Sequence, residues 1–181
     1  MMSILMQYDL EYIRKISENN KAFWHSIRQF RITGSRCYQL FTYGKRQHTD
    51  EEWAIKISKY FWPQVFTNKF VKHGIQYELT ARDVYIKDTG NNIITSGFIT
   101  SKKCPWLGYS PDGVVLDTLN HPKKLIEIKC PFKGSLVGLT ELLSNVNFLV
   151  QGTDGQWKLK NKHAYYAQIQ LGMIMLNVNN C

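Results

Sequence analysis

The chain has 181 residues, of which 44% are hydrophobic and 13% aromatic, so it can bury one core of ordinary size. This composition excludes disordered, collagen-like and coiled-coil chains. Lysine and arginine number 23 against 14 acidic residues, and the resulting net charge of +9 favours a polyanionic partner such as nucleic acid, although a merely basic soluble protein would carry the same charge.

The first half of the chain is predicted to be helical, because its apolar residues recur at a spacing that places them on one helix face. Thr49 and the three acidic residues after it are a typical helix start, and Pro63 ends that helix. The Thr33-Gly34-Ser35 turn leads into another helix. The expected helices are two short ones within residues 9–30, one from about 35 to 44, one from 50 to 62 and one from about 75 to 87.

After Gly90 the apolar period changes to two, which predicts strands. Residues 161–176 return to helical spacing and predict a last helix of about four turns. The strands should form a sheet of about three strands, which makes the chain an α/β protein. The segments with strand patterns are residues 92–100, 106–109, 113–116 and 125–129.

No internal repeat, low-complexity tract or linker divides the chain, so residues 1–181 are predicted to form a single domain.

The chain has four cysteines, none of them in a CxxC pair: Cys37, Cys104, Cys130 and Cys181. This spacing indicates free thiols rather than a disulfide framework or zinc ribbon. Without a secretory leader or a long apolar stretch, we expect a soluble intracellular protein, nuclear or cytoplasmic, that is not secreted and binds no membrane.

The most informative spacing lies among the predicted strands. The segment from Ser110 to Gly113, Ser-Pro-Asp-Gly, favours a tight turn that sets Asp112 at the mouth of the sheet. In a strand over residues 125–129, Glu127 and Lys129 share one face because side chains alternate. Two carboxylates and an ammonium group can then converge.

This set suits phosphodiester cleavage. Asp112 and Glu127 can hold Mg²⁺ together with the main-chain carbonyl of Ile128, and the metal polarises the phosphate and lowers the pKa of a bound water. Lys129 would orient that water or balance developing charge. The alternative is a simple hairpin turn and a solvated Glu127–Lys129 pair, which contributes under about 1 kcal/mol. The order of the two motifs favours the metal-dependent nuclease.

These motifs resemble the PD-(D/E)XK nuclease signature in the form used by the lambda exonuclease, or YqaJ-type viral recombinase, family. The resemblance covers about residues 22–178 and implies a restriction-endonuclease-like core, an α/β (α+β) fold with a small mixed sheet flanked by helices. Family members carry further strands after the last helix, and their absence here would leave an open sheet edge. Six blocks in family order carry the resemblance: Trp24-His25 followed by Arg28, Ile32-Thr33-Gly34-Ser35, Gly74-Ile75-Gln76-Tyr77-Glu78, Ser110-Pro111-Asp112-Gly113, Glu127-Ile128-Lys129-Cys130-Pro131, and Tyr166-Ala167-Gln168-Ile169-Gln170.

The resemblance implies a role for each matched residue at the metal. Asp112, Glu127 and the Ile128 carbonyl would bind Mg²⁺, for which Mn²⁺ is a substitute, and Lys129 would position or activate the attacking water. Glu78 and Gln168 would line the same site from two helices. Both have alternatives from the sequence alone: Arg82 lies four residues after Glu78 and offers a helix-surface ion pair, and Gln168 can be an exposed polar residue.

The resemblance also implies a pocket for a terminal 5′ phosphate, formed by Arg28, Ser35 and Ser110. A guanidinium, hydroxyl groups and a helix N-terminus are suitable phosphate ligands on physical grounds as well. Arg31 and Arg36 stand nearby in the sequence and either add phosphate contacts or are solvated, with solvation the preferred interpretation.

The sequence therefore predicts a Mg²⁺-dependent DNA exonuclease that hydrolyses duplex ends in recombination or DNA processing, with the 5′ to 3′ direction implied by the resemblance alone. Expected partners are double-stranded DNA ends, further copies of the chain, since family members form trimers, and a single-strand annealing protein. The alternatives are a catalytically inactive DNA-end-binding remnant and a structure-specific endonuclease of the same superfamily. Related nucleases hold an iron–sulfur cluster on four cysteines, but Cys104 and Cys130 lie in or beside sheet segments, which favours free thiols.

Overall fold

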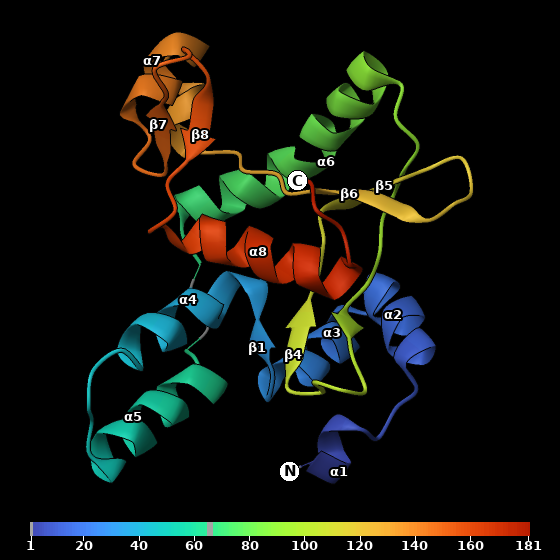
Figure 1. The fold of residues 1–181 in the computed structure, drawn as a ribbon, viewed down its shortest axis with the longest axis vertical. Coiled ribbons are helices and arrows are strands. Elements are labelled where there is room, and N and C mark those ends of the chain that lie inside the picture. Colours follow the sequence, from blue (N-terminus) through green and yellow to red (C-terminus); the bar gives the residue numbers. More distant parts are fainter. Residues whose placement is uncertain (1, 65–66) are drawn as a thin grey trace.

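Helices make up most of the N-terminal half of the computed structural model, which describes residues 2–64 and 67–181. Polar side chains set their ends: the Asp9 carboxylate accepts hydrogen bonds from two main-chain N–H groups of the first long helix, and Thr49 and Glu52 form a reciprocal capping box. The helices are α1 (Met2–Leu5), α2 (Leu10–Asn19), α3 (Lys21–Gln29), α4 (Gly34–Tyr43), α5 (Asp50–Phe61) and α6 (Lys69–Thr89) (Figure 1).

Helix α6 begins six residues earlier than the expected start near residue 75. The Asn68 side chain accepts a hydrogen bond from the Val71 N–H, which caps the helix at that point. Gly74 therefore lies inside the helix rather than before it. At the other end, Gly90 adopts a left-handed conformation with φ of 64°, as is common for the residue that ends a helix.

The strands form several small sheets rather than the single sheet that was expected. One sheet is mixed, and the other large one is antiparallel. In the mixed sheet the order is β1 (Ile32–Thr33), β4 (Leu107–Tyr109) and β3 (Ile99–Thr100), and in the antiparallel sheet it is β2 (Ile93–Ile94), β5 (Gly113–Leu116) and β6 (Pro122–Ile126).

The single strand expected over residues 92–100 is divided between these two sheets. Phe98 causes the break, because its side chain is fully buried in a cluster with Ile13 and Ile27 from the N-terminal helices. Its main-chain N–H donates to the buried Ser17 hydroxyl of α2 at 2.6 Å instead of to a neighbouring strand. Packing against α2 thus draws this segment out of the sheet.

The strand expected over residues 125–129 ends at Ile126. Beyond it, the Ile128 N–H donates to the Asp112 carboxylate at 2.7 Å rather than to a partner strand. β6 is an outer strand of its sheet, and its Leu125 N–H donates to the Asn180 carbonyl at 3.0 Å. The edge that was expected to be open is therefore partly contacted by the segment after the last helix.

The sequence predicts no element between residues 131 and 160, yet the structure contains four there. At the top left of Figure 1, α7 and the hairpin formed by β7 and β8 lie together. The elements are the 3-10 helix η1 (Phe132–Ser135), α7 (Leu139–Asn145), β7 (Leu149–Gln151) and β8 (Trp157–Leu159).

The last helix, α8 (Ala164–Leu176), crosses the middle of the molecule and packs against α4, β4 and β6 (Figure 1). It starts after residue 163 rather than at 161, since the His163 ring accepts a hydrogen bond from the Tyr165 N–H and caps it. Beneath it, Tyr109 and Leu125 form a second buried cluster. This packing brings α8 and the ends of β4 and β6 to one place. Within residues 2–64 and 67–181, no helix has the length and apolar character that crossing a membrane requires.

Candidate active site

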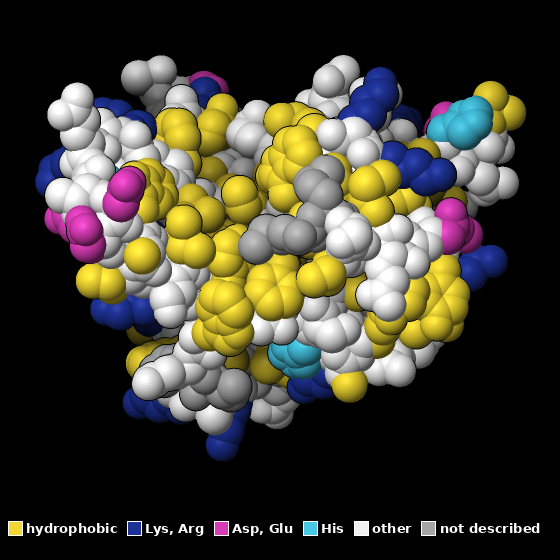
Figure 2. Space-filling model, turned by 90° about the horizontal axis from the view of Figure 1, so that it is seen from below, with side chains coloured by type: hydrophobic (Ala, Val, Ile, Leu, Met, Phe, Trp, Pro, Cys, Tyr) yellow, Lys and Arg dark blue, Asp and Glu magenta, His cyan; other side chains and the backbone are white. Residues whose placement is uncertain are grey.

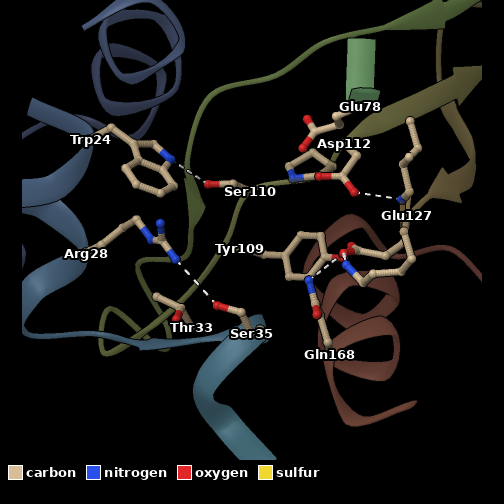
Figure 3. A pocket seen from close by; sticks show the side chains of 14 residues that line it. Trp24, Arg28, Thr33, Ser35, Glu78, Tyr109, Ser110, Asp112, Glu127 and Gln168 are labelled. Carbon is tan, nitrogen blue, oxygen red and sulfur yellow. Dashed lines mark hydrogen bonds and ion pairs between the residues drawn. The ribbon is translucent and has the colours of Figure 1, made fainter. Parts of the chain in front are cut away.

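Three carboxylates from three separate segments of the chain line one cleft of about 370 Å³ (Figure 3). Asp112 lies just before β5, Glu127 just after β6, and Glu78 in the middle of α6. All nine residues that were given a role at the metal or the 5′ phosphate from the sequence line this cleft. They are Arg28, Ser35, Glu78, Ser110, Asp112, Glu127, Ile128, Lys129 and Gln168.

The Glu127 side chain is only 3% exposed, and three donors hold its carboxylate. Oε1 accepts hydrogen bonds from the Lys129 ammonium and from Gln168 Nε2, the latter at 2.5 Å, and Oε2 accepts one from the Tyr109 hydroxyl. Lys129 and Glu127 therefore meet on one side of the chain as expected, although the strand has already ended. Gln168 faces the cleft rather than solvent.

Glu78 satisfies both interpretations offered for it. It lines the cleft, and one of its oxygens lies 3.3 Å from a guanidinium nitrogen of Arg82, four residues later in α6. The ion pair leaves the Glu78 side chain 41% exposed, so the carboxylate remains accessible from the cleft.

The negative charges in the cleft repel one another. Burial raises the pKa of Glu127, the Asp112 charge raises it further, and the Lys129 ammonium opposes both effects. Burial likewise raises the pKa of Glu78, again with the Asp112 charge adding to it. A cation placed among these carboxylates would relieve this repulsion.

The donor set fits a hard divalent cation such as Mg²⁺, which prefers oxygen ligands and retains several waters. Asp112 is fixed by the Ile128 N–H, which also places the Ile128 main chain beside the two carboxylates. Nowhere in the described parts of the chain do three or more His, Cys, Asp or Glu side chains form a complete metal cluster. Ligation here would therefore depend on a main-chain carbonyl and water beside the carboxylates.

The opposite end of the cleft carries positive charge and hydroxyl groups. The Arg28 guanidinium stacks on the Trp24 ring at 3.6 Å and approaches the Ser35 hydroxyl at 3.5 Å. Trp24 in turn donates to the Ser110 hydroxyl at 2.8 Å. Figure 3 shows Arg28, Ser35 and Thr33 on one side, the carboxylates on the other, and Ser110 between them.

Arg28 makes no ion pair with a carboxylate in the part of the chain that the structure describes. Burial, together with the nearby charge of Arg36, lowers its pKa to about 10. Thr33 lies beside it, only 2% exposed, with a buried hydroxyl that has no hydrogen-bond partner among the described residues. Thr33 also precedes the first turn of α4, whose N–H groups favour anions. This end of the cleft is therefore suited to a phosphate group.

Three side chains with contacts that matter in the cleft were given no role from the sequence: Trp24, Thr33 and Tyr109. Trp24 and Thr33 belong to blocks that were recognised, but only their neighbours were given functions. Tyr109 directly precedes Ser110, yet one aromatic residue in a strand pattern predicts only core packing. Burial and the Glu127 charge raise the pKa of Tyr109, so its hydroxyl stays protonated and donates.

Solvation of Arg31, the preferred interpretation from sequence, is wrong. Arg31 is 4% exposed, and its guanidinium donates to the main-chain carbonyls of Pro105, Ile27 and Leu5 at 2.9, 2.5 and 2.5 Å. These bonds join α1, α3 and the segment before β4, because a planar fork of donors can reach several carbonyls at once. Arg36 is half-buried, with its guanidinium 3.9 Å above the Tyr60 ring. None of the four cysteines forms a disulfide bond with another.

The chain is similar in sequence to one protein family and in fold to solved structures of an exonuclease. Residues 23–178 match the family described as the YqaJ-like viral recombinase domain. The crystal structure of an alkaline exonuclease, LHK-Exo, from Laribacter hongkongensis is similar, with a TM-score of 0.56 and 23% identity over 86% of this chain and 68% of the exonuclease. Its complex with dAMP gives a TM-score of 0.57 and 24% identity over 85% and 68% of the two chains. This similarity shows a shared fold. No curated protein matches the chain.

Proposed function

Because this chain belongs to the YqaJ-like viral recombinase family, we propose that it is a metal-dependent deoxyribonuclease with a restriction-endonuclease-like core, which hydrolyses DNA from duplex ends. The observation that carries the proposal is one cleft with carboxylates and a lysine at one end and, at the other, hydroxyl groups and an arginine that forms no ion pair with any described residue. The fold shared with an alkaline exonuclease, which has been crystallised with a nucleotide, supports it.

At the carboxylate end, Asp112, Glu127 and the Ile128 carbonyl are the residues that would hold Mg²⁺ or Mn²⁺. The bound metal would supply Lewis-acid polarisation of the phosphate and a water of lowered pKa. The protein keeps its carboxylates in place: the Ile128 N–H holds Asp112, while Tyr109 and Gln168 hold Glu127. Lys129 stands beside Glu127, where its ammonium can orient the attacking water or offset charge developing on the phosphate.

At the other end, Arg28, Ser35, Ser110 and Thr33 would hold a terminal 5′ phosphate. A guanidinium stacked on Trp24 keeps its donors in a fixed plane, which suits the bidentate geometry of a phosphate. With the 5′ phosphate at this end and the scissile bond at the carboxylates, the enzyme would proceed from 5′ to 3′.

The test is release of nucleotides from 5′-phosphorylated linear duplex DNA and from covalently closed circular DNA, each with Mg²⁺, Mn²⁺ or EDTA. We expect release from linear DNA alone, and only with metal. Cleavage of the circle would overturn the exonuclease in favour of an endonuclease. Tight binding of duplex ends without release would favour a catalytically inactive end-binding protein.

Variants of the cleft sharpen this test. Glu127→Ala and Lys129→Ala should abolish release while the proteins remain folded, because Glu127 would hold the metal and Lys129 would act on the attacking water or the phosphate. Glu141→Ala and Lys123→Ala, which change exposed residues outside the cleft, serve as matched controls. Near-wild-type release by either cleft variant would contradict the assignment. Assembly of several copies and an annealing partner stay predictions.

A further inference from the structure

A second cleft, of about 630 Å³, shares Arg28 with the candidate active site but none of its carboxylates. Its walls come from α3, from Arg36 of α4, and from Phe61 and Trp62 at the end of α5. This volume lies within the usual range for small-molecule and nucleotide sites. Arg28 therefore forms the boundary between two adjoining clefts.

The second cleft carries a positive charge that the proposed function does not use. Arg36 makes no ion pair with a carboxylate among the described residues, and neither does Arg28. The two guanidinium groups are close enough that the charge of Arg36 lowers the pKa of Arg28. Stacking on Tyr60 holds Arg36 in place. A phosphate on Arg28 would offset one of these charges and leave Arg36 for a second anion.

Aromatic side chains line the same cleft. Trp62 is 58% exposed, and Phe30 packs against both Trp62 and Phe61, with ring centroids 5.5 and 5.9 Å away. In Figure 2, which views the molecule from below, hydrophobic side chains gather across the middle of the face and lysines and arginines lie mostly around its rim. An exposed indole that a neighbouring ring contacts edge-on is a stacking surface for a planar base.

An arginine without an ion-pair partner among the described residues, in the same cleft as an exposed tryptophan, matches the two parts of a nucleotide. We propose that this second cleft binds a nucleotide on the 5′ side of the phosphate held by Arg28, with its phosphate on Arg36 and its base stacked on Trp62. The inference rests on the proposed function and extends it: the enzyme would engage strands with a short single-stranded 5′ extension as well as flush ends.

The test is binding in EDTA, so that cleavage does not interfere, measured by fluorescence anisotropy on three labelled duplexes. The first has a flush 5′-phosphorylated end, the second a two-nucleotide 5′ extension, and the third the same extension with abasic sites. Since stacking of one base on an aromatic side chain is worth ~1–3 kcal/mol, the abasic extension should bind about fivefold or more weakly than the normal extension. Trp62→Ala should remove that difference, and Arg36→Gln should weaken binding of the extended duplex more than that of the flush one.

Trp106→Ala, which changes a tryptophan 44% exposed outside the second cleft, and Arg46→Gln, which changes an exposed arginine, are the matched controls and should alter none of these ratios. Unchanged ratios in Trp62→Ala and Arg36→Gln would overturn the inference. So would an equal loss on all three duplexes, which would indicate a general contact with DNA or a surface for another protein. If the binding ratios are as expected but no metal-dependent release of nucleotides is found, the second cleft is supported and the proposed nuclease is overturned. Failure of the further inference and failure of the proposed function therefore give different results.

Discussion

At the scale of single residues, the cleft depends on side chains that hold other side chains. Tyr109 is 1% exposed, and its hydroxyl donates to the same Glu127 carboxylate that Gln168 and Lys129 contact. A carboxylate with this many donors keeps one orientation, which the proposed role of Glu127 as a metal ligand requires. Under the proposed function Tyr109 is therefore a positioning residue, and this role can be separated from its packing by removing the hydroxyl alone.

Tyr109→Phe should lower kcat on the order of tenfold, the lower limit seen for losses of groups that orient metal ligands, with little change in KM. The ring remains, but one donor to a buried carboxylate is lost, so the free energy of unfolding should fall by about 1–3 kcal/mol. Steady-state kinetics on linear duplex and denaturant unfolding give the two values. An unchanged kcat in a folded variant would show that Gln168 and Lys129 suffice to hold Glu127.

Arg28→Ala should act selectively on phosphorylated ends. A hydrogen bond to a charged group contributes about 1.5–3 kcal/mol, so kcat/KM should fall roughly 10- to 100-fold on 5′-phosphorylated duplex and little on duplex with 5′ hydroxyl ends. Rates on the two substrates, compared within each variant, measure this. Equal losses on both kinds of end would count against a phosphate pocket at Arg28.

At the scale of elements, the site depends on how closely α4 and α8 approach β4. The Tyr109 ring lies against Gly34 at the start of α4 and against Gly172 in α8. A Cβ at Gly34 would lie 2.5 Å from two ring atoms, and one at Gly172 would lie 2.7 Å from a ring atom and 2.8 Å from Leu125. Both glycines are needed for close approach, since each helix would otherwise be displaced from the ring that orients Glu127.

Gly172→Ala should lower the free energy of unfolding by about 1–3 kcal/mol, the usual cost of overpacking a well-filled core. Gly74→Ala is the matched control, because Gly74 lies inside α6 with open space around its Cβ position. It should leave stability unchanged or raise it by up to about 1 kcal/mol through helix propensity. Urea unfolding gives the free energy of unfolding of both variants. If Gly172→Ala is as stable as Gly74→Ala, α8 has room to move away from Tyr109.

At the scale of the whole molecule, the net charge of +9 should govern the binding of DNA that the proposed function requires. Phosphate contacts release counterions, so the logarithm of the binding constant should fall linearly with the logarithm of salt concentration, by about 0.9 for each phosphate neutralised. Anisotropy titrations of a duplex in EDTA at several salt concentrations give this slope. Arg28→Ala should reduce it by about one, and a flat response would argue against a surface that follows the DNA backbone.

Local signals in the amino-acid sequence were sufficient to predict most of the helices and most of the residues that line the cleft. Capping residues such as Thr49 and the change of apolar period located most helices, and the motifs around Asp112 and Glu127 identified the family and the residues that line the cleft. Only the tertiary structure decided that Phe98 leaves the sheet, that Arg31 is buried on three carbonyls, and that Tyr109 and Thr33 belong to the cleft. Caps and periodicity act over a few residues, whereas the Trp24–Ser110 and Glu127–Gln168 hydrogen bonds join residues 86 and 41 positions apart. Contacts at such separations depend on how the elements pack, and that packing has no local pattern from which it can be read.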